Sequence, residues 1–258
     1  MMRVQILLAA LAILTLSACV TDTEQVFTGE PSKEEAIRTR VELARRYIGE
    51  GNWEDAKRNL KIAAEINPNA ANVYEAFALV YQSTGEYELA EENFKKAIEL
   101  RKPFSRARNN YAAFLYSQGR YQEAEEQLEV VIKDTLYESR PQAFINLGLS
   151  RVQLDDFEGA REALTRALTM DRTNRLAIIE LAHVEFELGD WRSAERHLGI
   201  YKTLVRRQSP RALWLGIRLA NELGDENAQA SRSLALRNMY PESGEYQAYE
   251  RAVQRGEL

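Results

Sequence analysis

The chain has 258 residues, of which 45% are hydrophobic, and a formal net charge of −5. This length and composition suffice for a sizeable core, while the acidic balance argues against a surface that binds nucleic acid. With one cysteine, and His183 and His197 as the only histidines, neither an intramolecular disulfide nor a Cys-rich metal site can form. We therefore expect a helix-rich protein with no metal, no cofactor and no nucleic-acid partner.

The first nineteen residues differ in character from the rest. Arg3 precedes an apolar run from Val4 to Leu16, and small residues follow it. A membrane-spanning helix needs about 20 apolar residues, so this run is too short to be one. The order of features is typical of a secretory signal peptide. An ordinary signal peptide with a coincidental cysteine, or an uncleaved anchor, is the alternative.

The only cysteine lies at the end of this segment. The Leu-Ser-Ala-Cys run at residues 16–19 resembles the lipobox of bacterial lipoproteins. The resemblance implies that residues 1–18 are removed and that Cys19 is acylated on its thiol and its new amino terminus, which gives stable anchoring. Val20 stands where an Asp would favour the inner membrane, so the sorting rules of that class favour the periplasmic face of the outer membrane. The polar residues 19–32 are expected to form a lipidated tether.

From residue 33 onward the sequence repeats itself. Alanines recur at intervals of 34, 34, 36, 34 and 34 residues. In the first five units an aromatic residue lies three positions before the alanine, a Gly or Asp five before, and Leu or Phe four after. A large residue followed by a small one lies thirteen positions before each alanine. The alanines are Ala56, Ala90, Ala124, Ala160, Ala194 and Ala228. Such a period predicts an array of stacked units.

Each unit is expected to be a helical hairpin, with helix A followed by helix B. The Gly or Asp between the two helices tolerates the positive φ of a tight turn, and the small residues let paired helices approach closely. Four prolines fall between units, where they interrupt no helix: Pro68, Pro103, Pro141 and Pro210. The interval of 36 residues indicates a two-residue insertion near residues 134–140.

The period and its residue types resemble the tetratricopeptide repeat (TPR). The resemblance implies an all-α fold, a right-handed α-solenoid of six TPR hairpins over residues 33–250, with a C-terminal tail at 251–258. The sixth unit is degenerate, because Asp225 takes the aromatic position and Arg232 the position of Leu or Phe. Polar residues there suit a terminal unit that has no successor to pack against.

No pattern in the sequence points to catalysis. Neither histidine has a Ser or Cys nucleophile in a recognisable motif nearby, and phosphate-loop, zinc-protease and dinucleotide motifs are missing. Glutamate-rich runs at residues 86–99 and 123–129 are interleaved with the apolar frame and indicate solvated helix faces. We therefore expect a binding protein. An enzyme with a hidden site around His183 is the alternative from another class.

The inner surface of such an array is lined mainly by the A helices. Its inward, non-frame positions are apolar in the middle units, and an exposed apolar patch usually marks an interaction site. Coverage by neighbouring helices or by the C-terminal segment is the alternative. The candidate groove residues are Leu79, Gln82, Asn109, Ala113, Tyr116, Ile145, Leu149, Val152, Ile179, His183 and Phe186. Their partner would be an extended or amphipathic segment with apolar anchors.

The first unit offers a second candidate surface, which mixes basic and apolar residues. It consists of Arg38, Val41, Arg45 and Ile48. We do not expect a clamp for a C-terminal carboxylate, which TPR domains build from spaced Lys, Asn and Arg. Asn109, Asn110 and Asn146 are present, but basic residues do not accompany them in that arrangement.

Several stretches go beyond the general repeat and resemble the PilF/PilW family. They are residues 109–116, 120–121, the insertion at 134–137, residues 146–149 and 215–220, and the tail around residues 240–246. That family consists of six-repeat outer-membrane lipoproteins for type IV pilus biogenesis. The resemblance implies a non-enzymatic pilotin that binds the type IV pilus secretin and promotes its outer-membrane localisation and multimerisation. A lipid-anchored scaffold for peptidoglycan enzymes or for outer-membrane barrel assembly is the alternative.

Overall fold

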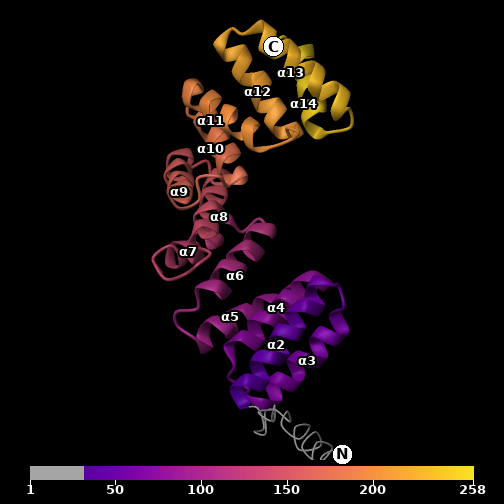
Figure 1. Ribbon diagram of the computed structural model, residues 1–258, viewed down its shortest axis with the longest axis vertical. Coiled ribbons are helices and arrows are strands. Elements are labelled where there is room, and N and C mark those ends of the chain that lie inside the picture. Colours follow the sequence, from indigo (N-terminus) through magenta and orange to yellow (C-terminus); the bar gives the residue numbers. More distant parts are fainter. Residues whose placement is uncertain (1–31) are drawn as a thin grey trace, which may run out of the picture.

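The computed structural model describes residues 32–258, so the predictions made for residues 1–31, including Cys19, lie outside it. Over the described range the chain forms thirteen α-helices and no strand. The helices build an elongated stack, with the N-terminal ones at one end and the C-terminal ones at the other (Figure 1). None of these helices has the length and apolar character needed to cross a membrane.

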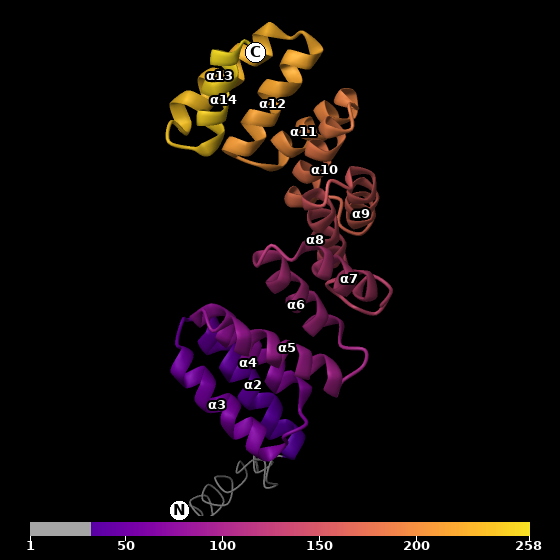
Figure 2. The ribbon, with the colours of Figure 1, turned by 180° about the vertical axis from the view of Figure 1, so that it is seen from behind.

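The first twelve of these helices pair into six hairpins, which confirms the repeat count and the all-α TPR fold. The A helices are α2 (Lys33–Gly49), α4 (Ala71–Thr84), α6 (Ser105–Ser117), α8 (Arg140–Gln153), α10 (Arg175–Glu187) and α12 (Pro210–Leu223). The B helices are α3 (Trp53–Ile66), α5 (Tyr87–Leu100), α7 (Tyr121–Val131), α9 (Phe157–Met170), α11 (Trp191–Leu204) and α13 (Glu226–Met239). Figure 2 shows the same succession from behind.

The A helices form the inner face of the stack. Within residues 32–258, each A helix contacts the next A helix, whereas successive B helices do not contact one another. The hairpins are therefore closer together on the A side, as expected for a curved solenoid. We call the A side the concave face and the B side the convex face.

The turn inside each hairpin requires a left-handed backbone. The glycines at five of these turns have φ between 69° and 81°, and Asp155 has φ of 59° at the fourth turn. In the second hairpin the Glu86 amide donates to the Tyr81 carbonyl at 2.9 Å, which closes the end of helix A. Asp155 is the one non-glycine residue with positive φ in the described range. The prediction that Gly or Asp serves this turn is confirmed.

The repeated frame forms the core. The frame alanines of the first five hairpins are fully buried, and their large partners four residues later are at most 1% exposed. In the fourth hairpin the small residue of helix A is Gly148, and a Cβ atom there would lie 2.7 Å from Cγ of Leu164. Close packing of small against large residues therefore holds each hairpin together.

The sixth hairpin uses the same arrangement with a charged residue. The guanidinium of Arg232 donates to Glu195 at 2.6 Å and to the carbonyl of Gly216, and its side chain is only 11% exposed. A Cβ on Gly216 would lie 2.9 Å from Cδ of Arg232, so Arg232 fills the place that Leu164 fills in the fourth hairpin. From the sequence alone, the polar residue at this position is attributed to the lack of a following unit to pack against. That explanation is wrong, because Arg232 is directed into the packed junction between the fifth and sixth hairpins.

The turn of the sixth hairpin comes one residue later than the frame predicts. Its glycine is Gly224, and Asp225 is the N-cap of α13, where it accepts from the Ala228 amide at 2.9 Å. The spacing from Ala228 predicts that Asp225 takes the position of the frame aromatic. In the structure Asp225 caps α13 instead. Asp is one of the residues preferred at the N-cap, because its side-chain oxygen can accept a hydrogen bond from a backbone amide of the first turn.

A thirteenth helix, α14 (Gly244–Arg255), closes the C-terminal end. It packs on α12 and α13 around buried Leu213, Ile217 and Leu236. After it, the carbonyl of Glu257 accepts from the Asn221 side chain at 3.3 Å. The boundary predicted at residue 250 falls inside α14, so residues 251–258 are not a separate tail. The repeat period carries no signal for this helix, because α14 does not share the frame.

Candidate functional site

The middle of the concave face holds a small apolar pocket between α6 and α8. Its volume is about 80 Å³, and it is lined by Ala112, Ala113, Tyr116, Leu128, Asn146, Leu149 and Ser150. The ring of Tyr116 meets that of Tyr121 edge-on at a centroid distance of 5.1 Å. Burial raises the pKa of Tyr116, so its hydroxyl stays protonated at neutral pH. Three of the predicted groove residues, Ala113, Tyr116 and Leu149, thus face one cavity.

The side-chain amides of Gln142 and Asn146 lie beside this pocket, and Asn146 contacts the buried amide of Asn109 behind it. Asn146 donates to the Asn109 side chain at 3.2 Å and accepts from Gln142 at 2.9 Å. An amide side chain offers two N–H donors and an acceptor oxygen, which are the groups that pair with a peptide backbone. An apolar pocket next to amides can hold one apolar side chain of an extended segment and bond to its main chain.

Other predicted groove residues are not open to a partner. Ile145 is fully buried, while Asn109 and Ile179 are 8% and 7% exposed. The expectation that their side chains face the groove is wrong, because Ile145 and Ile179 belong to buried core clusters and Asn109 is bonded to Asn146 of the next A helix. Leu79 and Val152 are half-buried and pack against the central core cluster. For these residues the alternative of coverage by neighbouring helices fits the structure.

Phe186 lies away from the Tyr116 pocket, at the junction of α10 and α12. The Arg218 guanidinium lies 4.3 Å from the centroid of its ring, a distance at which cation–π attraction acts. Phe186, Trp214 and Arg218 line a second pocket of about 140 Å³, which Ala252 and Leu258 close from the C-terminal side. The C-terminal segment therefore covers this end of the concave face, and the predicted groove is divided into two parts.

The two histidines contact different carboxylates. His183 Nε2 lies 3.5 Å from Glu187, and His197 Nδ1 lies 2.7 Å from Glu185. Burial, together with the nearby charge of Arg211, lowers the pKa of His183 to about 4, so this imidazole is neutral at pH 7. Within residues 32–258, no three or more His, Cys, Asp or Glu side chains are grouped as a metal would require. The histidines belong to helix contacts in the fifth and sixth hairpins.

The candidate surface on the first hairpin is only partly open. Val41 is 3% exposed, and Arg45 is paired with the buried carboxylate of Glu75. The expectation that these two side chains face a partner is wrong, because α4 packs over this side of α2. Arg38 is exposed and Ile48 is half-buried, so they remain at the surface.

Buried carboxylates are a feature that the sequence analysis missed. The fully buried Glu75 accepts hydrogen bonds from Arg45, from Arg106 at 3.2 Å and from Asn110 at 2.8 Å. Glu180 accepts from Arg211 at 2.7 Å, and burial raises its pKa. The available signal was the isolation of each glutamate within an apolar stretch of helix A, at residues 73–81 and 176–184. A buried charge requires such partners.

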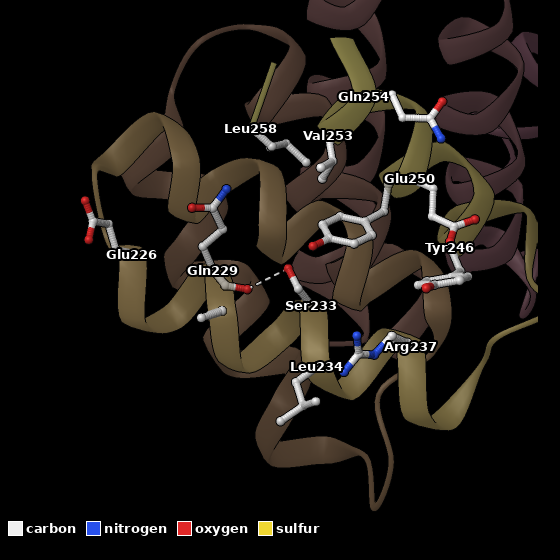
Figure 3. A pocket seen from close by; sticks show the side chains of 12 residues that line it. Glu226, Gln229, Ser233, Leu234, Arg237, Tyr246, Glu250, Val253, Gln254 and Leu258 are labelled. Carbon is white, nitrogen blue, oxygen red and sulfur yellow. Dashed lines mark hydrogen bonds between the residues drawn. The ribbon is translucent and has the colours of Figure 1, made fainter. Parts of the chain in front are cut away.

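A wider cleft separates α13 from α14 at the C-terminal end. It has a volume of about 750 Å³ and a mixed lining, in which Tyr246, Leu234 and Val253 alternate with Arg237 and Glu250 (Figure 3). The Ser233 hydroxyl on its wall donates to the Gln229 carbonyl at 2.8 Å. The frame could not predict this cleft, because one of its walls is α14.

Comparison with known proteins places the chain among TPR proteins. Residues 75–144 and 141–174 match the tetratricopeptide repeat family. The chain is 34% identical over 250 residues to the type IV pilus assembly protein PilF of Pseudomonas aeruginosa, covering 96% of this chain and 99% of that protein. The likeness therefore extends well beyond the repeat frame to nearly the full length of both chains.

Solved structures agree with this placement. A structure from the functional characterisation of Pseudomonas aeruginosa PilF has a TM-score of 0.78 and 35% identity, covering 84% of this chain and 98% of that one. The structure of PilW, described as a widely conserved type IV pilus biogenesis factor, has a TM-score of 0.74 and 23% identity over 83% of this chain and 98% of its own. At that identity the second match supports the fold alone.

Proposed function

The chain belongs to the PilF family of type IV pilus TPR proteins, and from that premise we propose that it is a pilotin, a non-enzymatic lipoprotein of the outer membrane. In this role it binds the pilus secretin subunit and promotes its localisation and multimerisation. The observation that carries the proposal is the match to PilF along 96% of this chain and 99% of the relative. Sequence similarity that came only from the common repeat frame would not extend to the insertion and the C-terminal helix.

The proposed mechanism combines an anchor with a binding surface. Acyl chains on Cys19 hold the protein at the periplasmic face of the outer membrane, and the solenoid binds the secretin. Subunits gathered on one membrane surface have a raised effective concentration, which favours ring assembly. Replacing Cys19 with Ala should therefore mislocalise both the protein and its client. Normal secretin multimers in the outer membrane with that variant would show that lipidation is not the targeting device.

The proposed client site is the Tyr116 pocket with the amides beside it. It joins an apolar cavity of about 80 Å³ to hydrogen-bonding groups on the concave face, a combination that suits an extended segment with an apolar anchor. Tyrosine at the edge of such a pocket is typical of residues that dominate binding energy.

The first experiment is deletion of the gene, followed by measurement of SDS-resistant secretin multimers in separated inner and outer membranes. Loss of multimers, or secretin monomers left in the inner membrane, is the expected result. Normal multimers in the outer membrane would contradict the pilotin role and leave a repeat scaffold with another client, to be sought by crosslinking.

The groove is tested by combining Tyr116→Ala with Leu149→Glu. We expect at least about a 30-fold loss of secretin affinity, the effect of removing one binding hot spot, with helical content near that of the natural protein. The matched control is Leu234→Glu on α13, since Leu234 is 51% exposed and lies away from α6 and α8. Unchanged binding by a folded double variant would move the site to the first hairpin or the convex face.

A further inference from the structure

A basic pocket lies where the insertion joins α7 to α8. Its volume is about 280 Å³, and its lining brings together Lys133, Arg140 and Arg166, with Glu162 as an opposing carboxylate. Ile132 and Phe144 contribute apolar surface to the same pocket. The lining comes from the end of α7, from α8 and from α9, so the pocket opens between B helices on the convex face.

The positive charge of this pocket is largely uncompensated. Over residues 32–258, Lys133, Arg140 and Arg166 make no ion pair within 4.0 Å with an acidic side chain. Arg140 is held in place because its Nε donates to the Ile132 carbonyl at 2.7 Å and its guanidinium lies 5.5 Å from the Phe144 ring centroid. A fourth cation of the lining, Arg151, is already paired with Glu125 at 2.7 Å. In the lining of the pocket three free cations therefore face one carboxylate, while Asp134 and the exposed Glu138 lie in the loop beside it.

An exposed apolar residue projects from the same loop. Leu136 is 90% exposed, the highest exposure among the large apolar residues of the described chain. It is presented by a local turn, in which the Asp134 carboxylate accepts from the Leu136 amide at 3.1 Å and from the Ser105 hydroxyl. Tyr137, the next residue, is half-buried against the core. The loop is thus fixed at both sides of a leucine that contacts no core.

We propose that this surface, formed by Lys133, Leu136, Arg140 and Arg166, docks on a membrane that contains anionic phospholipid. The cations bind phosphate headgroups, and Leu136 enters the boundary between headgroups and acyl chains. Each Lys or Arg near an anionic membrane surface contributes electrostatic attraction to it. An apolar side chain close to these residues adds binding free energy when it is buried in the membrane. An acidic protein surface would match the charge but would not require a fully exposed leucine at the tip of the loop.

Docking here leaves the concave face free. Arg140 and Phe144 lie on the side of α8 that faces the B helices, whereas Asn146 and Leu149 of α8 line the concave pocket. The membrane contact would therefore orient the solenoid with its Tyr116 pocket away from the lipid. The inference does not depend on the pilotin proposal, because it concerns lipid rather than secretin.

The test uses the full chain reconstituted into vesicles that carry a quenching lipid. A fluorophore is attached to Leu136→Cys, and the unsubstituted chain, whose only cysteine is Cys19, gives the background. We expect at least about twofold stronger quenching in vesicles containing phosphatidylglycerol than in phosphatidylcholine alone, with the difference lost in concentrated salt. A fluorophore at Gln122→Cys, at the opposite end of α7, should show no such difference.

The charge requirement is tested by combining Lys133→Glu with Arg166→Glu. Both side chains are exposed, so folding should be preserved, and the lipid-dependent quenching should disappear. The matched control, Lys61→Glu with Arg192→Glu, changes the net charge equally at other exposed positions and should keep it. Any of three results would overturn the proposal. They are equal quenching in neutral and anionic vesicles, no quenching at residue 136, and an equal loss of quenching in the control pair.

Discussion

The fourth and sixth hairpins fill the same steric position in different ways. Gly148 and Gly216 each leave room in helix A, and the residue sixteen positions later in helix B occupies it. In the fourth hairpin that residue is Leu164, which is fully buried. In the sixth it is Arg232, which also reaches back to Glu195 in the fifth hairpin. The same backbone geometry therefore accommodates either an apolar or a charged side chain, provided that the charged one has hydrogen-bond partners.

The difference extends to the whole junction between the fifth and sixth hairpins. Arg211 pairs with Glu180 at 2.7 Å, and Arg218 with Glu187 at 3.2 Å. Each pair joins α12 to α10, and His183 lies among these groups. The central hairpins share one continuous apolar cluster and the Glu91–Arg120 and Glu125–Arg151 ion pairs, but no histidine lies among them. The C-terminal junction should therefore respond to pH and the central one to loss of apolar volume.

The largest effect is expected from Leu164→Ala. It removes a fully buried side chain beside Gly148, where no side chain can close the gap, and core truncations of this kind cost about 2–5 kcal/mol of unfolding free energy. Urea denaturation followed by circular dichroism measures this cost. A loss below about 1 kcal/mol would mean that the fourth hairpin packs less tightly than described.

Arg232→Ala should cost about 1.5–3 kcal/mol, because the Gly216 carbonyl and Glu195 lose a charged hydrogen-bond partner. Arg232→Leu restores the residue type of the central frame and should cost less than Arg232→Ala in the same urea titration. If the two variants are equally destabilised, the charged hydrogen bonds rather than the filled volume hold this position.

Acid should weaken the C-terminal junction through His183. Its folded pKa of about 4 lies below the ordinary value of 6.5, so the unfolded chain binds the proton more readily. The associated stability is present above pH 6.5 and is lost as the pH falls toward 4, by about 2 kcal/mol at pH 4.5. Urea midpoints at pH 7 and 4.5 should differ less for His183→Gln than for the natural protein. An equal pH response in both proteins would contradict this assignment.

The smallest effect should separate the two glycines. Alanine favours a helix over glycine by about 1 kcal/mol, but a Cβ at residue 148 meets the branched Cγ of Leu164 at 2.7 Å. Gly148→Ala should therefore be net destabilising by about 1 kcal/mol. Gly216→Ala meets the longer and more adaptable Arg232 and should be close to neutral. Thermal melting of both variants tests the order, and a more damaging Gly216→Ala would reverse the comparison.

The repeat frame allowed much of this fold to be predicted from sequence. The alanine spacing and turn residues such as Asp155 identify six hairpins, because the contacts that form each hairpin join residues about thirty positions apart or fewer. Ile145 and Val41 were misplaced because their burial depends on how successive A helices approach, which the period does not encode. Arg232 was misjudged and Glu75 was missed for a similar reason, since the partners of a buried charge come from other hairpins. Tyr116 and Leu149 were correctly placed on one face because they project from neighbouring A helices, while the division of that face into pockets was not predicted.

The carboxylate of Glu75 has a consequence for how the solenoid comes apart. It lies on the second hairpin and bonds Arg45 of the first and Arg106 and Asn110 of the third. In most repeat arrays each unit interacts only with its neighbours, so units can be removed one at a time. Here too the contacts join neighbours, but one buried carboxylate takes partners from both sides, so removal of the first hairpin would cost it one of its two cations. The three N-terminal hairpins should therefore unfold as one cooperative block, and a stable fragment cannot begin at the second hairpin.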